Sequence, residues 1–163
     1  MEFVFEMLAE KHREQVVDIL NFYIKSSSAA YREEAVAYPF YDELSGPDMV
    51  SGYAMVGEHD HVIGFGLLEK YKPISTFGSL GDCMYFFRPE GTGQGLGSRM
   101  LARLEDDARK NGMSRLLVDI SDENSDSLGF HLANGFTEYG RLKRCWRKFG
   151  RDLGVVYLAK ELA

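Results

Sequence analysis

The sequence predicts one mixed α/β domain in which helices flank a central β-sheet. Short apolar stretches with strand character alternate along the chain with segments whose apolar residues recur at helical spacing, and this alternation is typical of a domain built on a sheet. The 163 residues, 45% of them apolar, are enough to bury roughly 70% of the unfolded surface. Because no repeat, low-complexity tract or long linker divides the chain, we expect residues 1–163 to form a single domain.

The first half of the chain is expected to contain one helix and three strands. The expected elements are a strand over residues 3–7, an amphipathic helix over 10–25, and two strands over 53–56 and 62–69. The last two flank the short polar turn Gly57-Glu58-His59-Asp60, which is a hairpin signature. Residues 31–47 are aromatic and acidic without a clean period, and Pro39 argues against one long helix there. Residues 70–81 are expected to form a loop.

The second half begins with a compact apolar run over residues 83–87, which predicts a buried strand. A glycine-rich segment over 91–98 and a helix that ends at Asn111-Gly112 follow it. A second buried strand is expected over 116–120 and a short helix over 123–134. The remainder, to Ala163, is expected to form two strands joined near Gly150.

The composition excludes several classes of protein. The chain has 19 basic and 25 acidic residues, hence a net charge of −6, whereas proteins that coat nucleic acid are basic. The modest net charge and the abundant apolar residues exclude intrinsic disorder. Cys83 and Cys145 form no C-x-x-C pair and no cluster with histidine, so neither a metal site nor a disulfide scaffold is expected.

The start of the chain lacks the pattern of a signal peptide. Apolar residues alternate there with Glu2, Glu6 and Glu10, whereas a signal peptide has a basic segment before an apolar core. No window approaches 18 uncharged apolar residues, the length that spans a bilayer. We therefore expect a cytoplasmic protein with neither a membrane nor a nucleic-acid partner.

The glycine-rich segment is suited to bind a phosphate group. Backbone N–H groups without side chains can approach an anion, and the following helix favours negative charge at its start. A P-loop is excluded because no Gly-Lys-Ser/Thr occurs, and none of Gly91, Gly93 and Gly95 has the third glycine that a dinucleotide loop needs. Taken alone, the run could also be a flexible surface turn.

Two segments resemble the cofactor segments of the GCN5-related N-acetyltransferase (GNAT) superfamily. Residues 89–101 are similar to its acyl-CoA loop, Q/R-x-x-G-x-G/A, with Gly95 and Gly97 on the small positions and Thr92 where Arg or Gln is usual. Asn124-x-x-Ser127, followed by a histidine and a Gly-Phe helix end, resembles the second cofactor segment.

A third motif resembles one branch of that superfamily, the phosphinothricin acetyltransferases. Residues 147–153 match its R-K-F-G-R-x-L signature, and residues 19–23 and 28–31 are similar to its first helix and acceptor loop. The resemblance covers nearly the whole chain. It implies a twisted, mixed and mostly antiparallel sheet flanked by helices, acetyl-CoA as the acetyl donor, and a homodimer as a family expectation.

The resemblance also implies which residues hold acetyl-CoA. Backbone N–H groups of the glycine loop would take the diphosphate, the strand before the loop would pair its main chain with the pantetheine arm, and the second segment would flank that arm from the far side. In this order the residues are Gly93, Gln94, Gly95, Leu96, Gly97 and Ser98; Tyr85, Phe86 and Phe87; and Asn124 and Ser127. Core packing is a compatible role for the three aromatic side chains.

Acetyl transfer to an amine needs a base, because amines near pH 7 are mostly protonated. The branch usually places Glu at the position of Asp82, and the shorter Asp favours a water relay over direct contact. His131 stands where many members carry Tyr and could give a proton to the leaving thiolate, although a packed histidine is the alternative. Asp119 and Glu123 are weaker candidates for the base.

The acceptor end is less determined. The branch commonly has Lys-x-Arg before the catalytic strand, and here Lys72 remains while Ile74 replaces the arginine. Tyr31 and Lys72 are the expected substrate-binding residues, and Arg32 with the aromatic cluster at 38–41 could shape a different pocket. We expect the basic run at 141–151 to be a solvated face, with a local positive field for anionic ligands as the alternative. His12, His59 and His61 are expected at the surface.

The predicted function is therefore transfer of an acetyl group to the primary amine of a small amino-acid-like substrate, of the phosphinothricin or methionine sulfone type among others. A protein or peptide N-terminus is the alternative acceptor. A non-catalytic acyl-CoA-binding module is the alternative class, because Thr92 and Asp82 both depart from the pattern of the branch.

Overall fold

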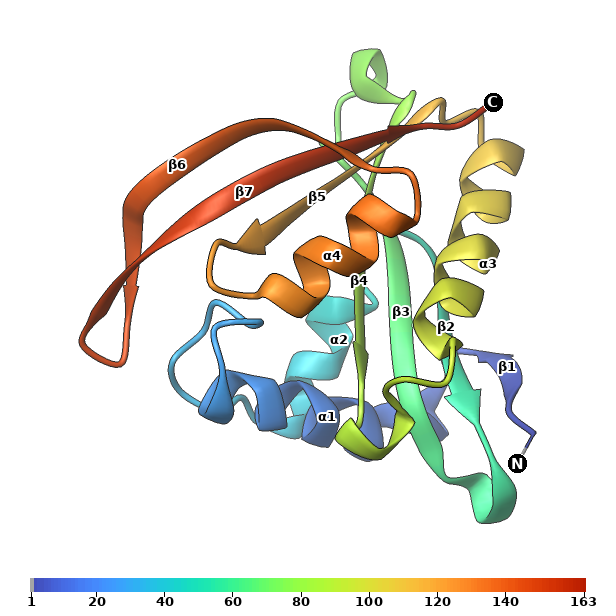
Figure 1. Ribbon diagram of the computed structural model, residues 1–163. Helices are drawn as coiled ribbons and strands as arrows, with labels where there is room; N and C mark the ends of the chain where they lie inside the picture. Colours follow the sequence, from blue (N-terminus) through green and yellow to red (C-terminus); the bar gives the residue numbers. More distant parts are fainter. Residues whose placement is uncertain (1) are drawn as a thin grey trace.

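The computed structural model, which describes residues 2–163, contains a seven-stranded sheet with helices packed on both faces (Figure 1). The strands are β1 (Val4–Met7), β2 (Met49–Val56), β3 (Val62–Lys70), β4 (Leu80–Phe87), β5 (Arg115–Ser121), β6 (Thr137–Lys148) and β7 (Arg151–Glu161). The helices are α1 (Arg13–Ser26), α2 (Tyr41–Leu44), α3 (Leu96–Lys110) and α4 (Ser125–Ala133). Short 3-10 turns precede or connect them, among them η1 (Glu10–His12), η2 (Tyr38–Phe40) and η4 (Ser75–Phe77).

The strand order is β1-β2-β3-β4-β5-β7-β6, and every neighbouring pair is antiparallel except β4 and β5. This parallel pair is short, because only Leu80–Asp82 align with Arg115–Leu117. Beyond Asp82, β4 stays on β3 up to Phe87, whereas β5 stays on β7 up to Ser121. The two strands therefore separate and leave two free edges facing a gap, which Figure 1 shows between β4 and β5. The predicted mixed, mostly antiparallel sheet is confirmed.

Two hydrophobic cores hold the helices on the sheet. On one face, α3 packs Met100, Leu101 and Leu104, none of them more than 1% exposed, against β4 and β5. On the other, α1 buries Val16, Val17 and its neighbours in a second core with β2 and β3. Burying one such side chain stabilises the fold by about 1.5–3 kcal/mol, so the amphipathic spacing of each helix fixes the face that it covers.

The elements follow the expected order, and their boundaries differ where strands pair. β4 begins at Leu80 and β2 at Met49, three or four residues earlier than the apolar runs alone predict. The reason is that the end of β3 pairs with both, Glu69 with Met49 and Lys70 with Gly81. The predicted loop at 70–81 therefore ends sooner and contains the turn η4. Pro39 lies inside η2, and the segment 31–47 forms no long helix, as expected.

His12 is buried, and its expected surface position is wrong. The side chain is 2% exposed, its Nδ1 accepts a hydrogen bond from the Ala9 N–H (3.0 Å), and Nε2 lies 3.1 Å from Glu6 Oε1. These contacts close the turn η1 in front of α1. The spacing of histidines along the chain carries no information about such a contact.

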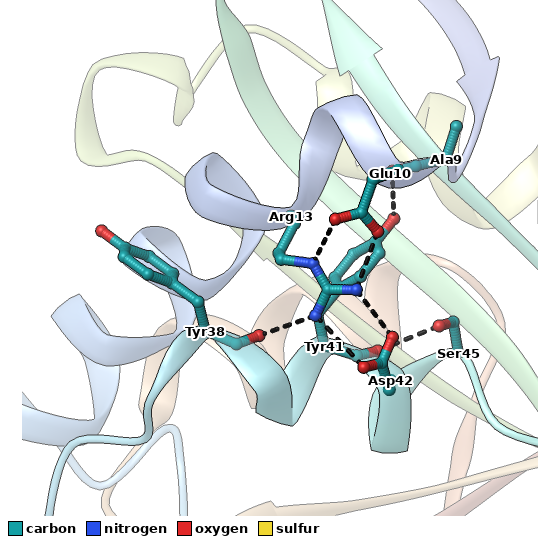
Figure 2. A network of polar contacts seen from close by, with 7 residues as sticks. All are labelled: Ala9, Glu10, Arg13, Tyr38, Tyr41, Asp42 and Ser45. Carbon is teal, nitrogen blue, oxygen red and sulfur yellow. Dashed lines mark hydrogen bonds and ion pairs between the residues drawn. The ribbon is translucent and has the colours of Figure 1, made fainter.

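A polar network at the start of α1 fixes the segment that contains η2 and α2 (Figure 2). The Arg13 guanidinium binds Glu10 (2.6 Å) and Asp42 (2.7 Å) and donates to the carbonyl of Tyr38 (3.1 Å). The Tyr41 hydroxyl donates to the Ala9 carbonyl (2.8 Å). One cation thus joins α1 to both ends of the segment 38–42, which forms part of the wall of the site.

Candidate active site

A cleft of about 1140 Å³ opens where β4 and β5 separate. Its walls come from the loop after α1, from β4 and β5, from the glycine loop before α3, and from α4. It therefore reaches from one face of the sheet to the other. Most of the expected site residues line it; Gln94 and Lys72 do not.

The edge of β4 that faces the cleft presents specific backbone groups. Arg88 N–H donates to the Ile63 carbonyl (2.8 Å), so Arg88 and Ile63 form a hydrogen-bonded pair at the end of β3 and β4. Because such pairs alternate along antiparallel strands, Phe86 turns its N–H and C=O toward β3, whereas Tyr85 and Phe87 turn theirs toward the cleft. The Tyr23 hydroxyl donates to the Phe87 carbonyl. Tyr85 and the Phe87 N–H thus remain available to an extended ligand, and Phe86 contributes its ring.

The glycine loop forms an anion cradle at the start of α3. Gly93 and Gly95 have φ values of 75° and 76°, the left-handed region that glycine adopts at little cost. No side chain caps α3 at Gly95, and the first N–H groups of a helix have no acceptor within it. The N–H groups of Leu96, Gly97 and Ser98 therefore point out of the helix start toward the cleft that these residues line.

The side chains of Thr92 and Gln94 stabilise this loop from within. Thr92 Oγ1 donates to the Pro89 carbonyl (2.7 Å), and Gln94 Nε2 donates to the Glu90 carbonyl (2.7 Å). Gln94 can accordingly offer a ligand only its backbone. At Gly97 a Cβ would lie 3.2 Å from the Phe130 ring, so a glycine there allows the loop to approach α4.

Asn124 and Ser127 lie at the start of α4 on the opposite wall. Asn124 Oδ1 accepts the Ser127 N–H (3.3 Å) and caps the helix, which leaves the Asn124 amide group for another partner. Both residues line the cleft. The predicted cofactor segments are thus brought together around one cavity although about thirty residues of sequence separate them.

His131 is buried behind Tyr85. It is 4% exposed, its Nδ1 lies 2.7 Å from the Ser127 carbonyl, and its Nε2 is hydrogen-bonded to the Tyr85 hydroxyl. Because a carbonyl can only accept, Nδ1 carries the proton and Nε2 accepts from the Tyr85 O–H. Burial lowers the pKa of His131, so the imidazole is neutral at pH 7.

Asp82 lies at the point where β4 and β5 separate, beside two other carboxylates. Glu69 faces it directly across the β3–β4 ladder, and Asp119 lies on β5 two residues past the last pair of the β4–β5 ladder. Burial, followed by the charges of Asp119 and Glu69, raises the pKa of Asp82 to about 7. Burial and the charge of Asp48 also raise the pKa of Glu69.

Asp82 and His131 are on opposite faces of the sheet. Successive strand residues point to opposite faces, and Met84 and Phe86, which share the face of Asp82, pack against the core of α1. Tyr85, which contacts His131, packs against the core of α3. The gap between the strands joins the two faces, so the two expected catalytic residues border the same cleft from different sides.

The loop after α1, which the resemblance predicts to face the acceptor, forms one wall of the cleft. The Tyr31 hydroxyl donates to Asp119 Oδ2 (3.1 Å), and its ring packs edge-on against Trp146. Burial and the charge of Asp119 raise the pKa of Tyr31. The Lys72 ammonium instead lies over the rings of Tyr71 and Phe77, 5.7 and 5.0 Å from their centroids.

Lys148 is buried, so the solvated face expected for the basic run is wrong at this position. It is 1% exposed, and its Nζ donates to the carbonyls of Ser27 (2.7 Å) and Ala30 (2.6 Å) in the acceptor loop. Burial lowers the pKa of its ammonium group. The neighbouring Phe149 N–H donates to Glu33 (2.7 Å). The hairpin of β6 and β7 therefore holds the loop after α1, a role that the sequence did not predict.

Ser121 is a cleft residue that the sequence gave no reason to select. It lies at the end of β5, is 2% exposed, and its Oγ has no hydrogen-bond partner among residues 2–163. An unpaired buried hydroxyl costs about 1–3 kcal/mol, and a ligand in the cleft would supply the partner that the fold does not.

Comparisons with known proteins agree with this geometry. Residues 16–136 match the model of the acetyltransferase (GNAT) family. The L-amino acid N-acyltransferase MnaT of Escherichia coli is 28% identical over 115 residues, which are 69% of this chain and 67% of that protein. The phosphinothricin N-acetyltransferase of Alcaligenes faecalis is 30% identical over 110 residues, 66% of this chain and 56% of that protein. These alignments thus span about two thirds or less of the curated relatives.

The fold is also similar to that of solved acetyltransferases. The crystal structure of a phosphinothricin acetyltransferase (Pat) from Sinorhizobium meliloti, in complex with AcCoA, superposes with a TM-score of 0.90 at 19% identity, covering 100% of this chain and 90% of that one. The chain belongs to the acetyltransferase (GNAT) family. Among residues 2–163, no helix is long and apolar enough to cross a membrane, and no group of three or more His, Cys, Asp or Glu side chains is arranged to hold a metal ion.

The residues present fit acetyl-CoA. The helix start that faces the cleft leaves N–H groups for a diphosphate, the free edge of β4 has backbone groups for an extended amide-containing arm, and Ser121 Oγ lacks a partner in the same cavity. Three sets of polar groups along one cleft thus lack hydrogen-bond partners within residues 2–163.

Proposed function

We propose that this protein transfers the acetyl group of acetyl-CoA to the primary amine of a small amino-acid-like substrate, with Asp82 as the general base. The observation that carries the proposal is the position of Asp82, which lines the cleft where β4 and β5 separate and lies opposite Glu69. Its burial there, which raises its pKa to about 7, supports the assignment. The names of the relatives from E. coli and A. faecalis, which refer to L-amino acids and phosphinothricin, support this class of acceptor.

Different residues along the cleft would bind different parts of acetyl-CoA. The backbone N–H groups of residues 93–98 would bind the diphosphate, the free edge of β4 at Tyr85 and Phe87 would bind the pantetheine arm, and Asn124 and Ser127 would flank it. When bound, acetyl-CoA supplies an acetyl group in a reactive thioester and departs as the thiol.

Asp82 prepares the amine. A base acts best when its pKa is near the working pH, and a carboxylate with a pKa of about 7 can accept the proton of a protonated amine, directly or through one water. The neutral amine nitrogen would then bond to the acetyl carbon while the carbon–sulfur bond breaks. The nitrogen would lose its second proton to water, and the sulfur would take one from the Tyr85–His131 pair. The neighbouring Glu69 and Asp119 attract the protonated amine to this end of the cleft.

For the leaving sulfur, we propose that His131 and Tyr85 act as a pair. The neutral imidazole accepts the Tyr85 O–H and fixes that hydroxyl inside the cleft. Because the pKa of His131 is lowered, only a minor fraction of the enzyme carries the imidazolium at pH 7, and only that fraction could give a proton from His131 itself. His131→Gln should lower kcat more below pH 7 than above it if the imidazolium gives the proton, and equally at all pH values if the imidazole only orients Tyr85.

The decisive experiment follows the release of CoA thiol from acetyl-CoA with a panel of amino acids, amines and short peptides. We expect turnover with an amino-acid-like amine, and its collapse in Asp82→Asn with acetyl-CoA binding retained. Asp106→Asn, which removes an exposed carboxylate from α3, is the matched control. Tight cofactor binding with no turnover for any amine would establish the non-catalytic module, and turnover of peptides alone would establish the N-terminal acetyltransferase.

We also propose that the protein is a cytoplasmic homodimer. β6 is an edge strand of the sheet, and the exposed side chains of Tyr139 and Leu142 lie on it. Its free Cys145 is exposed, which suits a reducing compartment. Sedimentation of the wild type and of Leu142→Glu measures the oligomeric state; a wild type that sediments as a monomer contradicts the dimer.

A further inference from the structure

The charged side chains of the cleft are almost all acidic or already paired. Five carboxylates line it: Glu69, Asp82, Asp119, Glu123 and Asp126. Two arginines line it, and one of them, Arg151, forms a double hydrogen bond with Glu123 (2.7 and 3.0 Å). Arg32 is the cleft-lining cation for which residues 2–163 provide no carboxylate partner.

Arg32 is positioned by a contact of its own side chain with Phe40 and by a hydrogen bond of the preceding residue, Tyr31. Its guanidinium lies over the Phe40 ring, 4.5 Å from the centroid. An aromatic face positions a guanidinium without using its N–H groups, so the donors of Arg32 remain free for a ligand. Tyr31, the preceding residue, is hydrogen-bonded to Asp119 on β5, and Arg32 and Asp82 line the same cleft.

The aromatic support is itself fixed. Phe40 lies between Tyr38 and Asp42, and Arg13 binds the carbonyl of the first and the carboxylate of the second (Figure 2). From the other side, Lys148 holds the carbonyls of Ser27 and Ala30, just before Arg32. Residues distant in sequence therefore hold the loop that carries Arg32 at Ser27, Ala30 and Tyr31. Arg13 separately holds the segment that carries Phe40.

An α-amino acid carries an ammonium group and a carboxylate on the same carbon, so its site must offer charges of both signs. Its ammonium group fits the carboxylates around Asp82, but its own carboxylate would be repelled by the same groups unless a cation binds it. Lys72 lies outside the cleft lining and Ile74 has no charge, so neither can do so. A guanidinium binds a carboxylate through two parallel hydrogen bonds.

From this arrangement we infer that Arg32 binds the α-carboxylate of the acceptor and thereby selects amino acids over simple amines. The inference rests on the proposed function and names the residue that determines its substrate class. Arg32 binds the α-carboxylate and makes no contact with the reacting nitrogen, so it affects binding more than the chemical step.

The test compares each amino acid with the amine that remains when its carboxylate is removed, for example methionine sulfone with 3-(methylsulfonyl)propylamine. In the wild type we expect kcat/KM to be at least tenfold higher for the amino acid. Arg32→Gln should raise KM for the amino acid about 10- to 100-fold, the effect of losing a charged hydrogen-bonded pair, and leave KM for the amine and for acetyl-CoA unchanged. Arg32→Lys should give a KM for the amino acid between those of the wild type and Arg32→Gln, because lysine keeps the charge but cannot form two parallel hydrogen bonds.

Two controls separate this role from the alternatives. Lys110→Gln removes an exposed charge at the far end of α3 and should change no parameter. If Lys72→Gln rather than Arg32→Gln raises KM for the amino acid, the carboxylate is bound by Lys72 and the inference is wrong. A wild type that prefers the decarboxylated amine contradicts it as well, and would identify a cationic acceptor drawn to the carboxylates alone.

Failure of the proposed function gives a different result. Calorimetric titration of the amino acid into the CoA-loaded protein measures carboxylate binding without turnover. If no amine is acetylated but Arg32→Gln still abolishes binding, the transferase proposal fails and the Arg32 site remains. Turnover that is indifferent to the α-carboxylate overturns the inference and leaves the transferase intact.

Discussion

The two halves of the cleft are built in different ways. The cofactor half consists of a glycine loop, a helix start and a strand edge, and most of its groups are backbone atoms, with Asn124 and Ser127 beside them. The acceptor half consists of a loop whose position depends on side chains from elsewhere, such as Lys148, which is more than 110 residues away. The two halves should accordingly respond differently to mutation.

The electrostatics of the two halves differ as well. Backbone N–H groups at a helix start favour an anion in the cofactor half. In the acceptor half, three carboxylates share a small, partly buried volume, and one of them has a pKa near neutrality. The comparison indicates that the cofactor half tolerates changes of side chain, whereas the acceptor half depends on each charged group.

The largest effect is expected at Asp82. Asp82→Asn should lower kcat about 10²- to 10⁴-fold, the usual contribution of a general base. The carboxylate is the active form, so wild-type kcat/KM should rise with pH through about 7, the pKa of Asp82. Rate–pH profiles of both proteins check this: the step near pH 7 should be absent in the variant. A step that persists would assign the titration to another group.

The same variant should be more stable than the wild type at pH 8. The folded state raises the pKa of Asp82 above the unfolded value of 3.8 to about 7, so above pH 7 folding holds a charge in an unfavourable place. Thermal unfolding at pH 8 and pH 5 measures this. The gain in Tm should be largest at pH 8 and shrink as the pH falls below 7; an equal gain at both would contradict the charge effect.

In the cofactor half, Gly95→Val should weaken acetyl-CoA binding by at least about tenfold. No protein atom lies within 4 Å of a Cβ at Gly95, so the effect comes from the left-handed backbone, where a side chain costs about 1–2 kcal/mol, and from the bulk beside the N–H groups. Gly112→Val is a matched control, because Gly112 has the same φ of 76° and an equally open Cβ position at the other end of α3. Calorimetric titration should show a loss of affinity in the first variant alone.

Lys148→Met tests the anchoring of the acceptor half. The change leaves two buried carbonyls without their donor, which should cost about 1–3 kcal/mol of unfolding free energy. We expect KM for the amine to rise several-fold while KM for acetyl-CoA is unchanged. Lys143→Met alters an exposed lysine of the same strand and is the control. A parallel rise of both KM values would mean that the hairpin supports the whole cleft.

The smallest effect is expected at Arg13. Its ion pairs are near the surface and contribute about 0–1 kcal/mol to stability, so Arg13→Ala should scarcely change Tm. It should nevertheless raise KM for the amine two- to threefold, because Phe40 loses the network that holds its segment. Steady-state kinetics and thermal unfolding of the same sample measure both. A variant with unchanged KM would separate the Arg13 network from the acceptor wall.

The prediction of the fold succeeded where local pattern is strong. The helical spacing of Val16 to Ile24 and the apolar run before the glycine loop predicted α1 and β4, and both are confirmed. Their ends were less well predicted, because the pairing of β4 with β3 extends the strand to Leu80. His12 and Lys148 were placed at the surface and are buried, since each is held by residues that its neighbours in sequence do not reveal.

The sequence by itself determined the order of the elements, the glycine loop before α3 and the family, because each of these is specified by residues within a few positions of one another. The tertiary structure alone decided that β4 and β5 separate at Asp82 and that burial, with the charges of Asp119 and Glu69, raises its pKa. It also decided that Arg32 lines the cleft without a carboxylate partner among residues 2–163. The reason is physical: backbone conformation follows local sequence, whereas burial and the balance of charge depend on groups that only folding brings together.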